Sequence, residues 1–455
     1  MSAGGAGRGW TLADVARMRV LSQRLVDPMP DPAAVVRHLT CTQGQDYPGS
    51  TTSIALRTTS RRLADVRAAY DDGEIVRSWP MRGTLFVVAA EDLGWMLGLT
   101  STKILRETTR RREALGLDTA TLTTAETIAL EALAGEGLTR GELLAAWEEA
   151  GLAPSAGRGY HLLFHLSLHG LICQGPTSGK EQRFVLMEEW ITSPRSLAGE
   201  EAVAEWFTRY VRSHGPVPAA DFLWWTKLLK RDLAPVLPAA REELEVIEVD
   251  GVEHWVDPQV LARHAESSRP SAAPLLLPGF DELVLGYGDR RAVLDRAEEE
   301  LVVPGRNGVF RPTVVSAGKA FGTWKRPTRR GAPVTVDPFG AGSPPTSPPE
   351  RGPPHLPPRH TALSRTRHPA LPRPPRGSDH GIARASSGSS PMMVVLGRGR
   401  SVVGGRVLRL AQHQPQALQV AAHGPLCAPA HPPAPGPRPT TCRSSPSGTA
   451  RRRSA

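Results

Sequence analysis

The spacing of hydrophobic residues changes from a helical period to a strand period three times along the first 340 residues. In the first of these units, hydrophobic residues recur every three or four positions and then alternate with polar ones on both sides of a short turn. The predicted helices are 12–25, 32–39, 54–58 and 63–70, and the predicted strands are 75–79 and 84–88 around Pro80-Met81-Arg82-Gly83. The first unit is therefore predicted to be a helical cluster followed by a hairpin.

The same order of elements is predicted twice more. The second unit contains helices 125–134, 139–150 and 160–169, then strands 171–174 and 183–186 around a Gly/Ser turn at 176–179. The third contains helices 202–211, 219–229 and 231–237, then strands 244–249 and 254–256 around Asp250-Gly251, a dipeptide typical of tight turns. This order is typical of the winged helix, in which one helix enters a DNA groove and the wing touches the backbone. Some winged helices bind proteins instead, so the fold alone does not decide the function.

The predicted fold class is α+β, with tandem winged-helix (helix-turn-helix) units, a small β-rich C-terminal segment and a disordered tail. The predicted boundaries are 1–95, 96–190 and 191–268 for the three units, 269–340 for the β-rich segment and 341–455 for the tail.

The tail differs from the rest of the chain in composition. Residues 341–455 contain 16 Arg, no Lys, one Asp and one Glu, a net charge of +14, whereas residues 1–340 carry a net charge of −4. The tail also holds 22 of the 43 Pro and has no aromatic residue, so it is predicted to be disordered. Its composition is that of a GC-rich gene translated out of frame, and a basic arm for nucleic acid is the alternative. The high pI therefore says nothing about the folded part.

Other sequence features limit the class of protein. No run of 18 apolar residues is present, so no membrane span is predicted, and the first nine residues lack the apolar core of a signal peptide. Cys41 and Cys173 precede the tail without a pairing pattern, which favours the reducing cytoplasm. The N-terminal glycines follow no predicted strand, so no phosphate loop is expected. We expect a monomer that needs no cofactor.

Residues Gln43-Gly44-Gln45-Asp46 place two carboxamides two positions apart, in a predicted turn after an amphipathic helix. They are a candidate pair for positioning a water molecule, and exposed polar side chains in a loop are the alternative. Taken alone, such a spacing is a weak signal.

Four stretches, taken together, resemble the AlkZ-like (YcaQ-type) family of winged-helix DNA glycosylases over roughly residues 10–340. They are Thr42-Gln43-Gly44-Gln45-Asp46, Ser78-Trp79-Pro80-Met81-Arg82-Gly83-Thr84-Leu85, the stretch LPGFDELVLGYGDR at 277–290, and NGVFRPTV at 307–314 with Gly322-Thr323-Trp324 after it. The resemblance implies tandem winged helices around double-stranded DNA and excision of alkylated bases, including bases in interstrand crosslinks. The two catalytic glutamines of the family map onto Gln43 and Gln45.

The chain departs from the family in two places. Members of the family often carry His after the Met-Arg-Gly-Thr-Leu run, where this chain has Phe86. They usually close with a helix after the Asp-Pro-Phe at 337–339, and the residues from 341 onward do not resemble it.

The chemistry of a carboxamide favours one class of lesion. A carboxamide is neither an acid nor a base at ordinary pH, whereas hydrolysis of an ordinary N-glycosidic bond needs both. An N-alkylated purine is already cationic, so it leaves without an added proton. Two fixed amide oxygens can orient the attacking water and stabilise positive charge on the sugar. We therefore expect hydrolysis of the N-glycosidic bond of N-alkylated purines.

Asp46 is the third candidate catalytic residue, as a base for the water or as a residue that orients it. The alternative is that its carboxylate caps the next helix. The region around Gln43 offers no Lys or other amine for a Schiff base, so a monofunctional enzyme is expected.

Three arginines are candidate DNA contacts. Arg82 lies in the first predicted wing, and Arg306 and Arg311 flank a predicted Asn307-Gly308 hairpin that could probe a duplex. The alternative for each is an ordinary surface charge. Arg110-Arg111-Arg112 is interpreted as a solvated helix face, because glutamates stand beside it.

Two further patterns are interpreted without a catalytic role. His161, His165 and His169 share a helix face, but the outer two are about 12 Å apart along the axis and cannot share one ion, so no metal site is predicted. Trp224 and Trp225 are predicted to build core rather than to stack on a base. Two other functions remain open, a noncatalytic DNA-binding regulator and a protein-interaction scaffold.

Overall fold

The computed structural model describes residues 9–266, 274–306, 308–326 and 333–340. The chain divides into two compact units, and the first, made of residues 1–356 and 424–455, holds every described residue. The second unit, 357–423, and the whole predicted tail lie outside the described residues. In the described part, no helix is long and apolar enough to cross a membrane.

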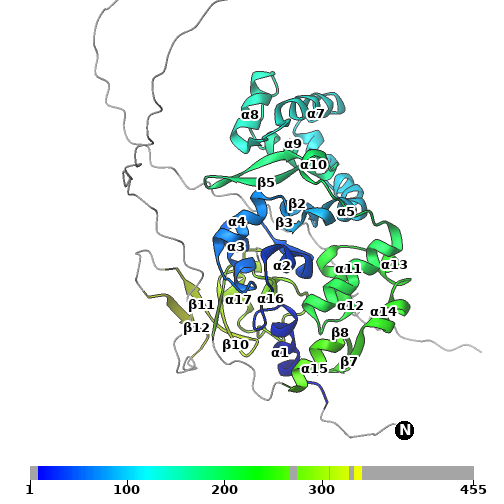
Figure 1. The fold of residues 1–455 in the computed structure, drawn as a ribbon, viewed down its shortest axis with the longest axis vertical. Helices are drawn as coiled ribbons and strands as arrows, with labels where there is room; N and C mark the ends of the chain where they lie inside the picture. Colours follow the sequence, from blue (N-terminus) through cyan, green and yellow to red (C-terminus); the bar gives the residue numbers. More distant parts are fainter. Residues whose placement is uncertain (1–8, 267–273, 307, 327–332, 341–455) are drawn as a thin grey trace, which may run out of the picture. The chain divides into compact units, whose positions relative to one another are not determined.

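The first unit combines helices with antiparallel sheets (Figure 1). Its α-helices are α1 (Leu12–Ser22), α2 (Pro32–Leu39), α3 (Tyr47–Leu56), α4 (Leu63–Asp71), α5 (Leu93–Glu107), α6 (Thr109–Ala114), α7 (Thr119–Leu133), α8 (Arg140–Glu149), α9 (Arg158–Leu168), α10 (Met187–Trp190), α11 (Gly199–His214), α12 (Ala219–Thr226), α13 (Lys230–Leu233), α14 (Leu237–Glu243), α15 (Pro258–Glu266), α16 (Glu282–Leu285) and α17 (Glu299–Val302). Its strands are β1 (Cys41–Gln43), β2 (Ile75–Met81), β3 (Thr84–Ala89), β4 (Leu138–Thr139), β5 (Ile172–Ser178), β6 (Glu181–Leu186), β7 (Glu245–Val249), β8 (Val252–Val256), β9 (Leu275–Leu277), β10 (Thr313–Ser316), β11 (Lys319–Lys325) and β12 (Thr335–Pro338). The short 3-10 helices η1 (Ala90–Asp92) and η2 (Pro304–Arg306) join some of these elements.

The first two predicted hairpins belong to one six-stranded sheet, in the order β1-β3-β2-β5-β6-β4. They meet where Arg77 of β2 lies opposite Gln174 of β5. Strand β1 pairs with β3 and places Gln43 opposite Phe86. Figure 1 shows α2, α3 and α4 on one side of β2 and β3, and α9 on the other. The candidate glutamines are therefore attached to the edge of a sheet that has helices on both faces.

The other two sheets are smaller. The third predicted hairpin, β7–β8, forms a separate sheet, and both residues of its Asp250-Gly251 turn have positive φ, as a tight hairpin turn requires. The predicted β-rich segment contains a four-stranded sheet in the order β12-β11-β10-β9. A hydrophobic cluster joins this sheet to Val20 and Leu25 at the end of α1. The C-terminal sheet is thus packed against the N-terminal helix.

Several predicted bounds were wrong for local reasons. Helix α3 begins at Tyr47 rather than at 54, with Pro48 in its first turn, where the missing N–H of proline costs nothing. Pro80 and Met81 continue β2, so the turn of the first hairpin is Arg82-Gly83 alone. The second hairpin is also longer than predicted, because its strands extend to Ser178 and Glu181.

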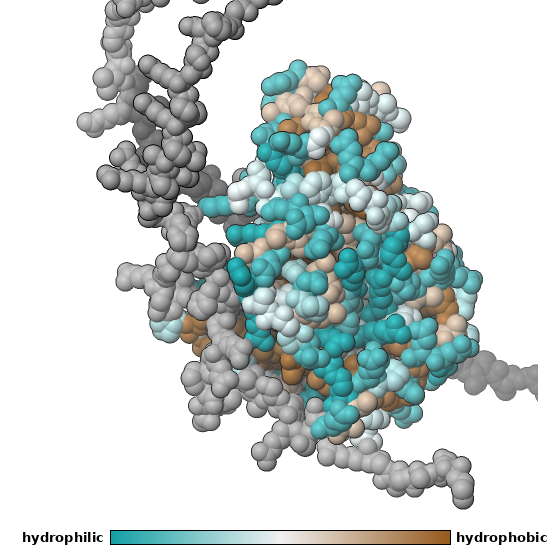
Figure 2. Space-filling model, in the orientation of Figure 1, coloured by the Kyte–Doolittle hydropathy of each residue, from teal (hydrophilic) through white to brown (hydrophobic). Residues whose placement is uncertain are grey.

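Charged residues on the surface near α2 and α11 are paired. Figure 2 shows hydrophilic residues over these two helices, and hydrophobic residues over β11 and β12. Arg209 of α11 forms ion pairs with the buried Asp92 and with Glu205, and Arg37 of α2 pairs with Glu91. These arginines already have carboxylate partners, which distinguishes them from the unpaired cations described below.

Candidate active site

The two glutamines are joined by their own hydrogen bonds. Gln43 is 3% exposed at the end of β1, whereas the side chain of Gln45 is exposed. Nε2 of Gln43 donates to Oε1 of Gln45 at 2.8 Å, and the main-chain N–H of Gln45 donates to Oε1 of Gln43 at 3.0 Å. The alternative of two exposed loop side chains is therefore wrong for Gln43. The pair leaves one lone pair on Gln43 Oε1 and the amide group of Gln45 for a water molecule.

Asp46 directly precedes α3 and is half-buried. Its side chain makes no capping hydrogen bond with the helix, contrary to the capping alternative. Its main-chain oxygen instead accepts the N–H of Ser50 at 2.8 Å. The carboxylate of Asp46 is therefore not used to cap α3.

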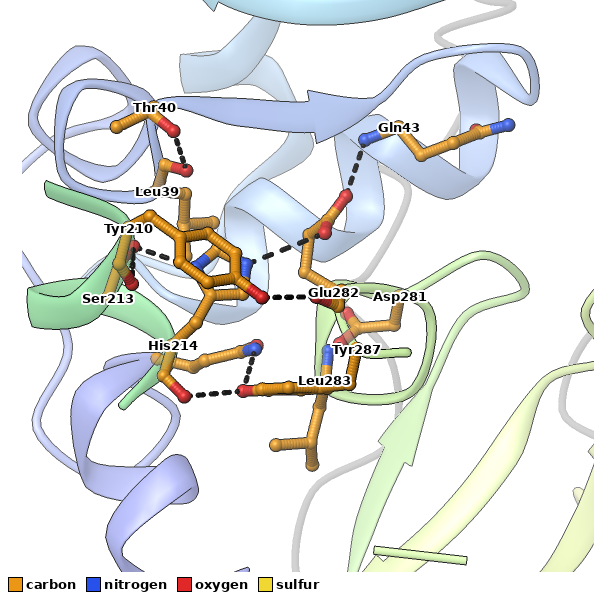
Figure 3. A network of polar contacts seen from close by, with 12 residues as sticks. Leu39, Thr40, Gln43, Tyr210, Ser213, His214, Asp281, Glu282, Leu283 and Tyr287 are labelled. Atoms are coloured by element: carbon orange, nitrogen blue, oxygen red, sulfur yellow. Dashed lines mark hydrogen bonds and ion pairs between the residues drawn. The ribbon is translucent and has the colours of Figure 1, made fainter. Parts of the chain in front are cut away.

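A buried carboxylate from the C-terminal segment holds the main chain of Gln43 (Figure 3). Oε1 of Glu282, the first residue of α16, accepts the N–H of Gln43 at 2.9 Å. Its Oε2 lies 3.6 Å from Nε2 of His214 at the end of α11, and both side chains are fully buried. Burial lowers the pKa of His214, and the nearby carboxylate of Glu282 opposes this effect. Three distant segments of the chain thus meet behind Gln43.

Aromatic side chains fix His214 in this position. The ring of Tyr210 lies one turn earlier on α11 and stacks on that of His214, with 4.5 Å between ring centroids and 17° between ring planes. The hydroxyl of Tyr210 donates to the Gly286 oxygen, and that of Tyr287 donates to the His214 oxygen at 3.1 Å (Figure 3). Two hydrogen bonds beside the Glu282–His214 contact therefore bind the α16 segment to α11.

A second buried charged group fastens the same segment to α3. Arg57, directly after α3, donates two hydrogen bonds of 2.9 Å to the two carboxylate oxygens of Asp281. Ser53 donates to Asp281 at 2.7 Å, and Gln23 accepts from Arg57 at 2.6 Å. Burial alone would raise the pKa of Asp281. The charge of Arg57 and its hydrogen bonds outweigh this effect, so the pKa is lowered. This group orients Glu282, the next residue, toward Gln43.

Phe86 is a core residue in this chain. It is 1% exposed, lies opposite Gln43 across β1 and β3, and belongs to the main hydrophobic cluster. The position at which the sequence departs from the expected family pattern is thus part of the buried core.

Unpaired cations surround Trp224 near the first hairpin turn. Arg82 and Lys227 lie over its ring, at 4.8 Å and 5.4 Å from the centroid, and the ammonium of Lys103 donates to the Lys227 oxygen. Burial, with the nearby charges of Arg82 and Lys103, lowers the pKa of Lys227. Among the described residues, none of these three cations forms an ion pair with a carboxylate. They form a positively charged group, which we call the Trp224 cluster.

The tryptophan prediction was therefore half correct. Trp225 is fully buried in the core, whereas Trp224 is half-buried under cations. Arg82 lies in the turn of the first hairpin as predicted, but burial lowers its pKa, so it is not an ordinary surface charge.

The predicted hairpin between Arg306 and Arg311 takes another form in the described residues. Asn307 and the side chain of Arg306 lie outside them. Residues 304–306 form η2, and β10 begins only at Thr313, so no strands flank Gly308. Arg311 is exposed and donates to the oxygen of Leu301 at 3.2 Å. Among the described residues, Arg311 and Arg82 make no contact with each other.

His165 of α9 and His169, which directly follows the helix, lie side by side. The rings of His165 and His169 are 4.4 Å apart, and burial, followed by the charge of His169, lowers the pKa of His165 to about 4. In the described part of the chain, no group of three or more His, Cys, Asp or Glu side chains is arranged to hold a metal ion.

Comparisons with known proteins show the family of this chain. A model of the family described as "DNA glycosylase AlkZ-like" matches residues 36–351, which is more than half of the chain. The chain belongs to this family. It is 26% identical over 325 residues to the "Interstrand DNA cross-link repair glycosylase" of Streptomyces sahachiroi, covering 67% of this chain and 85% of that protein.

The fold also resembles a solved structure of this AlkZ-like family. The match to Streptomyces sahachiroi DNA glycosylase AlkZ has a TM-score of 0.62 at 23% identity. It covers 74% of this chain and 92% of the solved one. This likeness shows the mixed fold of helices and antiparallel sheets, in agreement with the predicted α+β class.

Sequence reasoning missed the residues that support the glutamines. Glu282 lies inside one of the four family-like stretches, yet nothing local shows that it reaches Gln43, 239 positions earlier. His214 is a single histidine near the end of a helix and carries no signal of its own. Only the tertiary contacts identify these residues.

Proposed function

We propose that this AlkZ-like protein is a monofunctional DNA glycosylase that hydrolyses the N-glycosidic bond of N-alkylated purines in double-stranded DNA. The observation that carries the proposal is the hydrogen-bonded Gln43–Gln45 pair, whose main chain is held by the buried Glu282. Crosslinked purines are the second proposed substrate class, because the relative from Streptomyces sahachiroi is named for crosslink repair. We also propose that the protein acts as a monomer in the cytoplasm.

In the proposed reaction the glutamines place one water molecule. The free lone pair of Gln43 Oε1 accepts a hydrogen bond from this water, and the amide group of Gln45 donates one to its oxygen. The water oxygen bonds to C1′ while the bond from C1′ to the purine breaks. The bonding electrons neutralise the cationic purine, so the base leaves without a proton. Asp46 takes the proton that the water loses.

Two groups of cations are proposed to bind the DNA. We propose that Arg82, with Lys103 and Lys227 of the Trp224 cluster, contacts backbone phosphates, and that Arg306 and Arg311 contact the duplex elsewhere. The helices that precede each of the three hairpins are proposed to be winged-helix units, with the boundaries predicted above.

Base release from duplex DNA tests this function. The full chain is incubated with duplex containing N7-alkylguanine, beside the double variant Gln43→Ala/Gln45→Ala and the single variant Asp46→Asn. We expect release by the wild type and a loss of at least a hundredfold in the double variant, a size typical of losing a positioned catalytic group. Unchanged release by the double variant would place the active site elsewhere.

The alternative is a noncatalytic DNA-binding regulator, favoured by Phe86 in the place of the family histidine. A folded wild type that binds intact duplex but releases no base establishes the regulator and rejects the enzyme. Binding to neither intact nor alkylated duplex supports a protein-interaction scaffold.

A further inference from the structure

Arg77 crosses the turn that carries the two glutamines. It lies on β2, opposite Val87 of β3 and Gln174 of β5, in the middle of the six-stranded sheet. A Cβ atom at Gly44 would lie 3.1 Å from both Cγ and Cδ of Arg77. The stem of Arg77 therefore packs directly against the residue between Gln43 and Gln45, and the glycine there makes this close approach possible.

The guanidinium of Arg77 has no polar partner among the described residues. Its Nε atom is buried without a hydrogen bond, and so is the hydroxyl of Tyr70. The group lies over the ring of Tyr47, 5.4 Å from the centroid. Burial lowers the pKa of Arg77, and the tyrosines and the Asp46 carboxylate oppose this effect without forming a bond. Arg77 is thus a largely buried cation whose hydrogen-bonding capacity is unused.

Arg57 is a buried arginine with a purely structural role, and its hydrogen bonds provide a comparison for Arg77. Its guanidinium donates to Asp281, Ser53 and Gln23, and all three of its nitrogens have partners. Most buried polar groups in proteins have a hydrogen-bond partner, so a largely buried guanidinium without one has donors left for a water molecule or a ligand. In the described part of the chain Arg77 has no such partner, and it lies beside the proposed catalytic pair.

We propose that Arg77 binds a backbone phosphate of the DNA strand next to the Gln43–Gln45 pair. The planar fork of a guanidinium matches two phosphate oxygens, and phosphodiesters are the anions that DNA presents. Because the Arg77 stem touches Gly44, the bound phosphate belongs to a nucleotide at or beside the one that loses its base. This inference rests on the proposed function, since it takes DNA as the ligand.

Salt dependence of DNA binding tests the charge. Full-length wild type and Arg77→Met are titrated with undamaged duplex over a range of KCl concentrations, and the affinity is followed by fluorescence anisotropy. Methionine keeps an apolar stem over Gly44, so we expect about tenfold weaker binding and a slope of log Kd against log salt that is smaller by about 0.9, the value of one phosphate contact. Arg241→Met is the matched control, because Arg241 also lies over a ring, that of Trp255, but pairs with Glu253. The control is expected to keep the wild-type slope.

A neutral phosphate tests the position. Duplexes with an alkylated guanine carry a methylphosphonate at one phosphate at a time, on either side of the lesion. We expect one position at which the wild type binds about tenfold more weakly while Arg77→Met is unaffected, because contacting partners are not additive. Losses that are equal for both proteins at every position overturn the assignment.

The outcomes separate this inference from the proposed function. A wild type that binds no duplex at all rejects both, whereas a wild type that binds but releases no base rejects only the enzyme. A folded Arg77→Met with wild-type slope and affinity rejects only the phosphate contact. If Arg77→Met does not fold, Arg77→Lys keeps the charge and loses the fork. It is expected to keep the slope and to bind several-fold more weakly, and wild-type affinity in that variant overturns the inference.

Discussion

The main chain of Gln43, rather than its side chain, is bound to the C-terminal segment. Its N–H donates to Glu282, while among the described residues its carboxamide bonds only within the Gln43–Gln45 pair. A substitution at position 43 therefore removes the proposed chemistry and keeps the anchor. A substitution at position 282 weakens the anchor and keeps both carboxamides. The contribution of the anchor and that of the carboxamides can therefore be measured separately.

Glu282→Gln is expected to slow base release about fivefold and to leave duplex affinity unchanged. Glutamine has nearly the same shape, but a neutral acceptor forms a weaker hydrogen bond than a carboxylate, by about 1 kcal/mol. Single-turnover release and anisotropy measure the two quantities. In a Gln43→Ala background we expect no further loss, because Glu282 acts through Gln43.

An NMR measurement checks the contact without any activity. In protein labelled with 15N-glutamine, the amide signal of Gln43 is identified by its absence from Gln43→Ala. We expect Glu282→Gln to move this signal upfield, as the loss of a charged acceptor requires. A signal that stays in place, with release at the wild-type rate, shows that Glu282 does not position Gln43.

At the scale of elements, the sequence predicted what local periodicity determines. The three hairpins and most helices were predicted because their hydrophobic residues recur with a regular period within segments of about five to fifteen residues. Helix α5 was missed, since Gly94 and Gly98 weaken its helical signal. The three-residue β1 was missed as well, and so was the pairing of β2 with β5, because pairing between distant strands leaves no local pattern. The same reason hid the contact between Glu282 and Gln43.

The packing of α2 against the end of α1 is expected to weaken in acid. His38 of α2 donates from Nε2 to the oxygen of Ser22 at 2.6 Å, and burial lowers its pKa to about 4. In the unfolded chain His38 therefore becomes protonated near pH 6.5, whereas in the folded chain it becomes protonated only near pH 4. The stabilisation is complete above pH 6.5 and is lost as pH falls from 6.5 to 4, by up to about 3 kcal/mol.

His38→Gln keeps a donor for Ser22 and removes the titration. Urea denaturation at pH 7.5 and pH 4.5 should show a difference in unfolding free energy that is about 2 kcal/mol smaller in the variant than in the wild type. An identical pH dependence in both proteins excludes His38 as the source.

At the scale of the whole described unit, α1 connects the beginning of the chain with its C-terminal sheet. The turn between β10 and β11 places Gly318 against the main chain of Ala16, and Val20 and Leu25 enter the hydrophobic cluster of that sheet. Arg19 of α1 lies over the ring of Tyr287, with 3.7 Å to the centroid. Residues at both ends of the described unit therefore share one core.

Gly318→Ala is expected to destabilise the protein by about 2 to 4 kcal/mol. A Cβ at this position would overlap the Ala16 oxygen, and the residue has a φ of 84°. Gly251→Ala is the matched control, with a φ of 76° and no atom within 4 Å of the new Cβ. The control measures the cost of positive φ alone, about 1 kcal/mol. Equal unfolding free energies for the two variants would show that the close contact between Gly318 and α1 does not limit the size of the residue at position 318.

The bond between Gln43 and Glu282 also bears on synthesis and inheritance. A ribosome that has made the first 95 residues has made both glutamines, but the carboxylate that holds the main chain of Gln43 is 239 positions away. A nascent chain, or a gene interrupted before codon 282, carries the intact motif without the arrangement that the proposed reaction requires. The presence of Gln-x-Gln in a shorter open reading frame is therefore not sufficient evidence of a working glycosylase.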